Sequence, residues 1–340
     1  MKIFLPFQPK SIGGTSTFAI KFRDVMKQLG HDVYFELPLT YDLLFLIVQA
    51  PFGYLQNAKS KGIRIVQRLD GVYYWTIAKS WFPLYNAKSA LIRYFYSDYC
   101  IYQSNYCRQA CNQFLGPSLK PSSIVINGVD LKLFTPSGKK VNLRKNAEEL
   151  IVFNASDFRY RHQIDPILAA VDTYRHKCNF NCRLVLAGSF SREVESYPGE
   201  ILKQNWITFL GPLKNKDLPV YERSSDMFIF SHTNPPCPNN IIEAMACGLP
   251  ICGLTDGSMT ELCIDGVNSL LIPIKESGYW TQKRIDTDKF AENIDKVSKN
   301  LKRFSNKSRY LAEQKFDIMN MGKKYESIFS KILDGKFDRS

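Results

Sequence analysis

The sequence predicts an α/β protein made of two parallel-sheet domains, and three observations support this. Short runs rich in β-branched and aromatic residues alternate with stretches of helical length, which is typical of βαβ units. The alternation stops at a stretch with proline, glycine and lysines, residues 133–142, and then restarts. The chain has 340 residues, enough for two domains that each bury their own core.

In the first half, short apolar runs are the predicted strands. The residues 18–29 have helical spacing and Gly30 ends them, so a helix is expected there. Residues 31–37 mix polar and apolar side chains, as a strand at a sheet edge does. The predicted strands are 2–6, 31–37, 43–48, 63–67, 99–103 and 123–126.

The second half repeats the pattern and ends in a charged helical tail. Its predicted strands are 150–154, 183–187, 206–210, 227–231, 250–253 and 269–272. Residues 286–333 are expected to be helical, with an amphipathic helix at 316–333. The predicted domains are therefore 1–140 and 141–315, with 316–340 forming a helix that packs back on the first domain.

Composition narrows the class of protein. Apolar residues make up 45% and charged residues 23%, as in folded soluble proteins. The apolar run 43–48 is far shorter than the ~20 residues of a spanning helix, and Pro6 breaks the N-terminal run too early for a signal peptide. The nine cysteines lack paired spacing, so we expect buried thiols in a reducing cytoplasm.

The net charge of +13 is concentrated in the first half. Residues 1–136 hold 15 Lys and Arg against 7 Asp and Glu, a net +8, and the remainder holds 30 against 25, a net +5. A basic surface suits an anionic partner: nucleic acid, acidic lipid headgroups or a phosphate-bearing substrate. No nucleic-acid recognition motif is present, so we expect no nucleic-acid partner. Simple solubility is the other explanation of the charge.

Residues 231–250 carry the strongest functional signal. A strand ends near Ser231, a proline-bearing loop follows, and a helix is expected to start near Asn239 as its N-cap and to stop at Gly248. A helix N-terminus at the carboxyl edge of a parallel sheet binds phosphate or sugar hydroxyls. Glu243, one turn inside, would repel a phosphate but can accept hydrogen bonds from the two hydroxyls of a ribose.

These residues resemble the donor site of glycosyltransferase family four, whose members have the GT-B fold of two Rossmann-like domains facing each other across a cleft. The run PCPNNIIEAMACGLP at 236–250 resembles the family motif, and Glu261 follows it. Further matches fall in the family's order along nearly the whole chain. They are Gly13-Gly14 and residues 126–130, 187–189, 210–211 and 265–269.

The resemblance implies a retaining hexosyltransferase that takes a sugar from a UDP- or GDP-sugar without a metal or other cofactor, and we expect no D-x-D triplet to hold a metal. In the family, the glutamate matching Glu243 binds the ribose, and the backbone at Asn239 and Asn240 approaches the sugar and diphosphate. The family's basic pair neutralises the diphosphate. Arg159 matches its arginine, and His162 stands at its lysine, with Arg161 as a substitute.

Four further residues complete the predicted site. Gly13 and Gly14 would let backbone N–H groups approach the diphosphate, because glycine lacks Cβ. Ser189 follows a strand end of the donor domain, and Asp70 follows a strand of the first domain as a catalytic candidate. The expected acceptor is a glycan or a lipid-linked molecule, assembled as cell-surface polysaccharide or lipopolysaccharide at the inner membrane face.

Two departures from the family keep other functions open. The family has a second glutamate eight residues before the first, where this chain has Pro235, and its first-domain histidine has no match; Gln49 holds the comparable place. A degenerate, non-catalytic binding protein is one alternative. A nucleotide-sugar epimerase is another, although it needs acid–base residues that are scarce here.

Residues 71–102 are unusually aromatic, with Lys79, Lys88 and Arg93 interleaved. Aromatic rings can stack on sugars or lie at a membrane interface, where the lysines would favour anionic headgroups, so peripheral membrane association through the basic first domain is one interpretation. The other is that these rings pack the core of the first domain.

Overall fold

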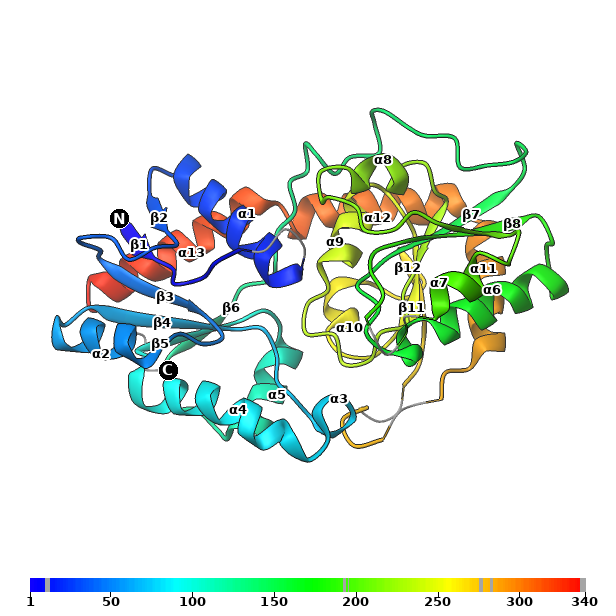
Figure 1. Cartoon of the computed structure of the whole chain (residues 1–340). Coiled ribbons are helices and arrows are strands. Elements are labelled where there is room, and N and C mark those ends of the chain that lie inside the picture. The colour runs from blue at the N-terminus through cyan, green and yellow to red at the C-terminus, as the bar shows by residue number, and fades with distance from the viewer. Residues whose placement is uncertain (10–12, 192–193, 195, 275–277, 282–283, 337–340) are drawn as a thin grey trace. The chain divides into compact units, whose positions relative to one another are not determined.

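The computed structural model in Figure 1 describes residues 1–9, 13–191, 194, 196–274, 278–281 and 284–336. The chain forms two compact units. The first contains Met1–Gly128, Tyr279–Thr281 and the segment from Ile318 onward. The second contains Val129–Gly278 and Gln282–Asp317.

The first unit is built on a parallel sheet of six strands, as the sequence predicts. The strand order is β2-β1-β3-β4-β5-β6, so β2 lies at an edge as expected. All five residues of β3 are buried, because helices cover both faces of a parallel sheet. The strands are β1 (Lys2–Phe4), β2 (Asp32–Tyr34), β3 (Leu43–Ile47), β4 (Arg64–Leu69), β5 (Tyr99–Tyr102) and β6 (Ser122–Ile124).

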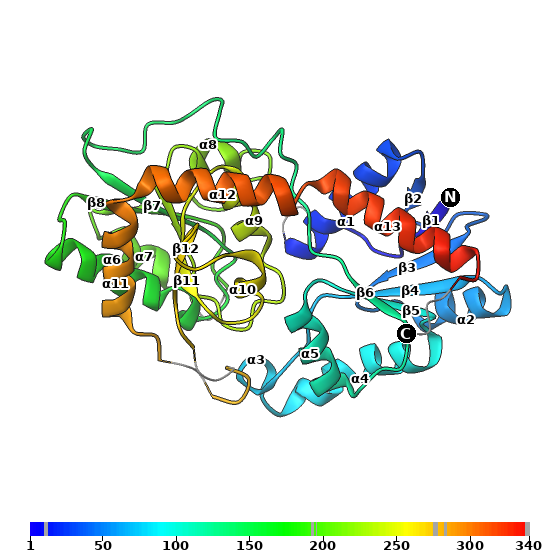
Figure 2. The same cartoon turned by 180° about the vertical axis from the view of Figure 1, so that it is seen from behind.

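Helices from both ends of the chain cover this sheet. Figures 1 and 2 show α1, in blue, beside α13, in red, and rings from the two helices share one core with β3. A 3-10 turn (Lys79–Trp81) precedes α4 and a π-helical turn (Ile92–Tyr96) follows it. The helices are α1 (Gly14–Gln28), α2 (Phe52–Ser60), α3 (Trp75–Ala78), α4 (Phe82–Leu91), α5 (Asn105–Leu115) and α13 (Ile318–Leu333).

The second unit repeats the architecture. Its six parallel strands have the order β12-β11-β10-β7-β8-β9, and all six predicted strands are present. The interior strands β7, β8 and β10 are buried along their whole length. The strands are β7 (Leu150–Ala155), β8 (Cys182–Ala187), β9 (Ile207–Phe209), β10 (Met227–Ile229), β11 (Ile251–Leu254) and β12 (Ser269–Ile272).

The helices of this unit pack in two pairs, α6 with α11 and α9 with α12. The expected helical tail is three helices, interrupted at Lys299–Asn300 and Phe316–Asp317, and only the last belongs to the first unit. The helices are α6 (Asp165–Lys177), α7 (Tyr197–Ile201), α8 (Leu218–Glu222), α9 (Asn239–Ala246), α10 (Met259–Leu262), α11 (Thr287–Ser298) and α12 (Leu301–Lys315).

The contacts divide the chain after Gly128, before the expected boundary at residue 140. The segment between these positions is held by the second unit, because the Arg223 guanidinium donates hydrogen bonds to the carbonyls of Leu133, Thr135 and Lys139. The change in composition at 133–142 therefore marks an exposed stretch of one unit, not the point where the units separate.

Two expectations from composition can be compared with the structure. Eight of the nine cysteines are buried, as small hydrophobes are, and Cys178 is the exposed exception. Within the residues that the structure describes, no helix is both long and apolar enough to span a membrane.

Candidate functional site

The carboxyl ends of β7 and β8 approach each other closely at one edge of the second sheet. Gly188 has φ +128, and a Cβ there would lie 1.7 Å from the carbonyl oxygen of Ser156, so only glycine fits. The Ser156 N–H donates to the Ala187 carbonyl at 3.0 Å, and the Ser189 hydroxyl donates to the Asp157 carboxylate. The predicted site residue Ser189 is thereby fixed beside the segment that follows β7.

Helix α9 begins at the same edge, but not as the sequence predicts. Its first helical residue is Asn239, and the position before it is Pro238, which has no side-chain acceptor; the expected Asn239 N-cap is therefore wrong. Instead, the Asn240 side chain anchors the first turn, donating to the Ala155 carbonyl at 2.8 Å and to the Ser156 hydroxyl at 3.2 Å. The start of α9 is thus tied to the end of β7.

The C-terminal end of α9 agrees with the prediction. Gly248 has φ +82, its N–H donates to the Met245 carbonyl, and the Leu249 N–H donates to the Ala244 carbonyl. This pair of bonds is the Schellman motif, which satisfies the last carbonyls of a helix.

Glu243 lies one turn inside α9 and is only 3% exposed. Its Oε1 accepts a hydrogen bond of 2.9 Å from the Asn215 side chain, which comes from the loop after β9. The sequence singled out the strand end just before this loop but not Asn215, because an asparagine in a lysine-rich loop carries no motif of its own. The contact holds the carboxylate in place.

The loop before α9 is fixed from the neighbouring βα turn. The Asp256 carboxylate accepts hydrogen bonds from the backbone N–H groups of Asn234 and Gly257, both at 2.8 Å. A Cβ on Gly257 would lie 2.4 Å from Pro235, and the Ser258 N–H donates to the Pro235 carbonyl. Pro235 therefore packs against a glycine at the place where the family has its second glutamate.

The two predicted arginines differ in their contacts. Arg159 is mostly exposed, with Nη2 3.7 Å from the Asp157 carboxylate. Arg161 donates from Nε to the Tyr197 hydroxyl at 2.8 Å, lies over the Tyr197 ring, and has Asp165 3.5 Å away. Arg161 is thus directed towards α7.

Two histidines lie close to these arginines. The His162 ring stacks on Tyr160, and burial lowers its pKa. His232, which follows β10 and was not predicted as a site residue, stacks on Phe230 with Nδ1 3.5 Å from the Gln163 amide. Burial, with His162 and Arg159 nearby, lowers the pKa of His232 to about 3, so its ring is neutral at ordinary pH.

In the first unit, Gly13 and Asp70 follow strands β1 and β4 in the chain. Gly13 has φ +123 directly before α1, whose first residue is Gly14. Asp70 accepts a hydrogen bond from Arg68. The Arg68 side chain is only 1% exposed, also donates to Asn127 at 2.9 Å, and lies over the Phe18 ring. Gln49 donates to the Ser89 hydroxyl at 2.8 Å.

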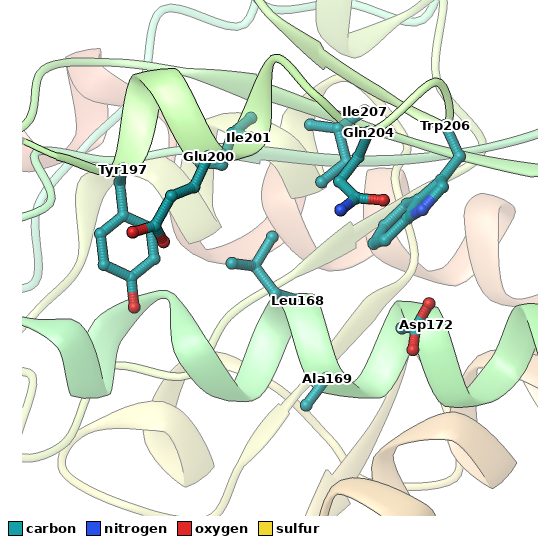
Figure 3. Close-up of a pocket in the computed structure, with 9 residues that line it drawn as sticks. All are labelled: Leu168, Ala169, Asp172, Tyr197, Glu200, Ile201, Gln204, Trp206 and Ile207. Carbon is teal, nitrogen blue, oxygen red and sulfur yellow. The ribbon is translucent and has the colours of Figure 1, made fainter.

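A separate hollow lies between α6 and α7 (Figure 3), with a volume of about 320 Å³. None of the predicted site residues lines it, and it meets them only through Tyr197, the contact of Arg161. Its lining consists of Leu168, Ala169, Asp172, Tyr197, Glu200, Ile201, Gln204, Trp206 and Ile207.

The two Rossmann-like parallel sheets have the architecture of the GT-B fold. Residues 148–300 match the family model described as Glycosyl transferases group 1. The match covers 153 of the 340 residues, includes Arg159, Ser189, Asn240 and Glu243, and assigns this segment to the glycosyltransferases.

Solved structures with similar folds cover nearly the whole chain. HepE of Anabaena, in complex with UDP and glucose, has a TM-score of 0.73 at 18% identity, covering 97% of this chain and 99% of its own. The sucrose-phosphate synthase of Thermosynechococcus elongatus has a TM-score of 0.77 at 16% identity, covering 98% and 99%. The lipopolysaccharide outer core galactosyltransferase WaaB, in its apo form, has 0.64 at 15%, covering 97% and 100%. No curated protein matches the sequence.

Proposed function

We propose that this glycosyltransferase moves a hexose, with retention, from a UDP- or GDP-sugar to a glycan or lipid-linked acceptor. The observation that carries the proposal is the buried Glu243 carboxylate in α9, held by Asn215. A carboxylate fixed in this way accepts hydrogen bonds from two neighbouring ribose hydroxyls without an entropic cost of ordering. In support, a protein of the same fold, HepE of Anabaena, is known in complex with UDP-glucose.

The start of α9 would bind the rest of the donor. Backbone N–H groups in the first turn of a helix are not used by the helix itself and carry partial positive charge. Asn239 and Asn240 belong to this turn, and the Asn240 contacts to β7 fix its direction. Ser189 donates a hydrogen bond to Asp157, whose neighbour Ser156 accepts one from Asn240. These groups would bind the sugar and the diphosphate.

Cationic side chains would stabilise the charge that develops on the diphosphate as the sugar leaves. Arg159 is the arginine that we propose for this role, since the Arg161 side chain already donates a hydrogen bond to the Tyr197 hydroxyl. His162, with its lowered pKa, would contribute as a neutral hydrogen-bond donor. In the first unit, Gly13 and Gly14 remain the proposed backbone contacts for the diphosphate, and Asp70, oriented by Arg68, the proposed catalytic carboxylate.

In the proposed reaction, the acceptor hydroxyl oxygen bonds to the anomeric carbon on the face from which the diphosphate departs. The bond between that carbon and the diphosphate oxygen breaks, and the diphosphate oxygen takes the hydroxyl proton. Arginine charges serve here in the role of a metal, so the proposal includes no metal or other cofactor. In the described part of the chain, no three His, Cys, Asp or Glu side chains form a group that could hold a metal ion.

The acceptor is proposed from the family resemblance. It would be a cell-surface polysaccharide or lipopolysaccharide intermediate, with the enzyme in the cytoplasm at the inner membrane face. WaaB, one of the proteins with a similar fold, is a lipopolysaccharide galactosyltransferase. A non-catalytic nucleotide-sugar binding protein is the second candidate, and the observation that favours it is Pro235, packed against Gly257 in place of a carboxylate.

Release of nucleoside diphosphate over a panel of UDP- and GDP-sugars, with glycan acceptors, separates the two candidates. Release that depends on donor and acceptor supports the transferase; tight donor binding without release supports the binding protein.

Glu243→Gln tests the site itself. The amide keeps the shape but loses the charge that strengthens hydrogen bonds to hydroxyls, so we expect donor Kd to rise roughly 10- to 100-fold. Glu292→Gln, a surface change on α11, is the matched control and should bind as the wild type does. Calorimetric titration with the preferred donor measures both, and unchanged affinity in Glu243→Gln would show that the ribose lies elsewhere.

A further inference from the structure

The helical segment 79–96 exposes an apolar face to solvent. Side chains spaced three or four residues apart lie on one side of a helix and form a stripe along it. Here the stripe contains the apolar residues Trp81, Leu84, Leu91 and Phe95, with Lys88 between Leu84 and Leu91. Their exposed fractions are 58%, 63%, 45% and 73%. We call this stripe, with the flanking Tyr85 and Tyr94, the outer face.

The opposite face of the same segment is buried and combines the apolar Ile92 with three polar side chains, so it is unusually polar for the buried face of a helix. Asn86, Ser89 and Arg93 are each at most 5% exposed. Asn86 exchanges two hydrogen bonds with the Tyr73 backbone, at 2.9 and 2.8 Å. The Ser89 hydroxyl accepts from Gln49 at 2.8 Å, and Arg93 donates to the Gly116 carbonyl.

These buried contacts fix the rotation of the helix. Turning the outer face inwards would break several buried hydrogen bonds, including that of Arg93 to the Gly116 carbonyl, and each is costly to leave unmade. The exposure of the outer face is therefore built into the fold of the first unit.

The charges around the outer face favour an anionic partner. Residues 71–97 contain no Asp or Glu, whereas Lys79 and Lys88 lie in the helical segment. The two carboxylates that flank this stretch are both paired, Asp70 with Arg68 and Asp98 with Lys59. The Lys88 ammonium lies 5.5 Å from the ring centre of Phe52, which is itself exposed and extends the apolar surface.

The shape of the surface favours a bilayer over a protein. In both Figures 1 and 2, α4 lies at the periphery of the first unit, with no labelled element on its outer side. The stripe extends along roughly 20 Å of helix, at about 1.5 Å per residue. A protein partner would need a groove to accept this convex helix, whereas a lipid interface accepts it without a shaped partner. Trp, Tyr and Lys are side chains that occupy such interfaces.

We propose that the outer face of segment 79–96 binds the surface of a bilayer containing anionic phospholipid. Trp81, Leu84, Leu91 and Phe95 enter the interface, and Lys79 and Lys88 contact the headgroups. The inference rests on the proposed location at the inner membrane face and names the surface that holds the protein there.

Flotation with vesicles, in the absence of donor and acceptor, tests this proposal. The full chain should float with phosphatidylcholine vesicles that contain phosphatidylglycerol, and much less with phosphatidylcholine alone. The variant W81A/L84A/L91A/F95A should lower the bound-to-free ratio roughly tenfold or more, and K79Q/K88Q should lower it several-fold in a salt-dependent way. The control L39A/L119A/F180A/L202A removes exposed apolar side chains elsewhere and should float like the wild type.

Three results would overturn the proposal: no flotation of the wild type, equal flotation of the outer-face variant, or an equal loss in the control. A wild-type dimer that the outer-face variant abolishes, without vesicle binding, would assign the surface to a second copy instead. Equal melting temperatures of all variants establish that they fold. Vesicle binding without sugar transfer would contradict the proposed function alone, and transfer without vesicle binding would contradict this inference alone.

Discussion

At the scale of single residues, the second unit uses side chains whose chemistry depends on where a strand ends. His232, two residues after Phe230, is the example that sequence reasoning missed. A histidine after a strand is unremarkable in a sequence, since nothing local indicates whether its ring is buried. In the fold, its position against Phe230 and Gln163 keeps the imidazole neutral.

The lowered pKa of His232 predicts a dependence of stability on pH. The folded pKa, about 3, lies below the ordinary value of 6.5, so the unfolded chain takes up this proton first as the pH falls. The contribution is fully present above pH 6.5 and is lost towards pH 3, by at most about 1.4 kcal/mol per pH unit. His232→Phe keeps the ring contact and should flatten that part of the stability curve, as measured by urea unfolding from pH 7 to 4.

The control for this prediction is His176→Gln, because His176 lies on the exposed surface of α6. Carboxylates titrate in the same pH range, but the wild type and both variants share them, so their effect cancels when the stability curve of a variant is subtracted from that of the wild type. Parallel curves for wild type and His232→Phe would show that the His232 ring is not shielded from water.

At the scale of elements, the sequence predictions were right where residues within an element determine its bounds. They were wrong where residues distant in the sequence determine them. The hydrophobic runs located the interior strands of both sheets, because a strand buried on both faces must be apolar along its length, and the mixed pattern of residues 31–37 located the edge strand β2. Gly248 located the end of α9 because few other residues adopt a positive φ. The start of α9 was misjudged, since its anchoring bond runs from Asn240 to Ala155 and no local pattern reveals that partner.

The C-terminal end of α9 depends on another distant partner, Arg309 of α12. Its guanidinium donates to the last helical carbonyl, that of Ala246, at 2.7 Å, and to the Phe134 carbonyl at 2.8 Å. A cation is favourable at a helix C-terminus, and hydrogen bonds from a charged donor are among the stronger ones. Arg309 thereby joins α9, α12 and the stretch that follows Gly128.

Replacing Arg309 by Met should therefore destabilise the second unit by about 2–3 kcal/mol, because three carbonyls and the Glu313 carboxylate lose a charged donor. Lys302→Met, on an exposed position of the same helix, controls for the loss of a positive charge and should change stability by less than about 0.5 kcal/mol. Chemical denaturation of the full chain measures both. Equal effects of the two substitutions would assign the loss to net charge and not to these bonds.

At the scale of the whole molecule, segments that lie far apart in the sequence belong to the same unit. The first unit is completed by α13, although about two hundred residues of the other unit intervene in the sequence. The apolar periodicity of 316–333 predicted an amphipathic helix, and its return to the first domain was a separate expectation. Periodicity alone cannot name the surface that such a helix covers, because any apolar face of matching size would satisfy it.

This arrangement predicts that a change in α13 weakens the first unit and spares the second. Phe329 is fully buried, with its ring centre 5.3 Å from that of Phe45 in β3 and 5.8 Å from that of Tyr325. Phe329→Ala should cost about 3–5 kcal/mol through lost burial and the cavity left behind. Leu333→Ala, at an exposed position of the same helix, should cost far less. Amide hydrogen exchange of the full chain should then show faster exchange in β3 and β4 with β7 and β8 unchanged. Equal acceleration in both sheets would mean that the two units unfold as one.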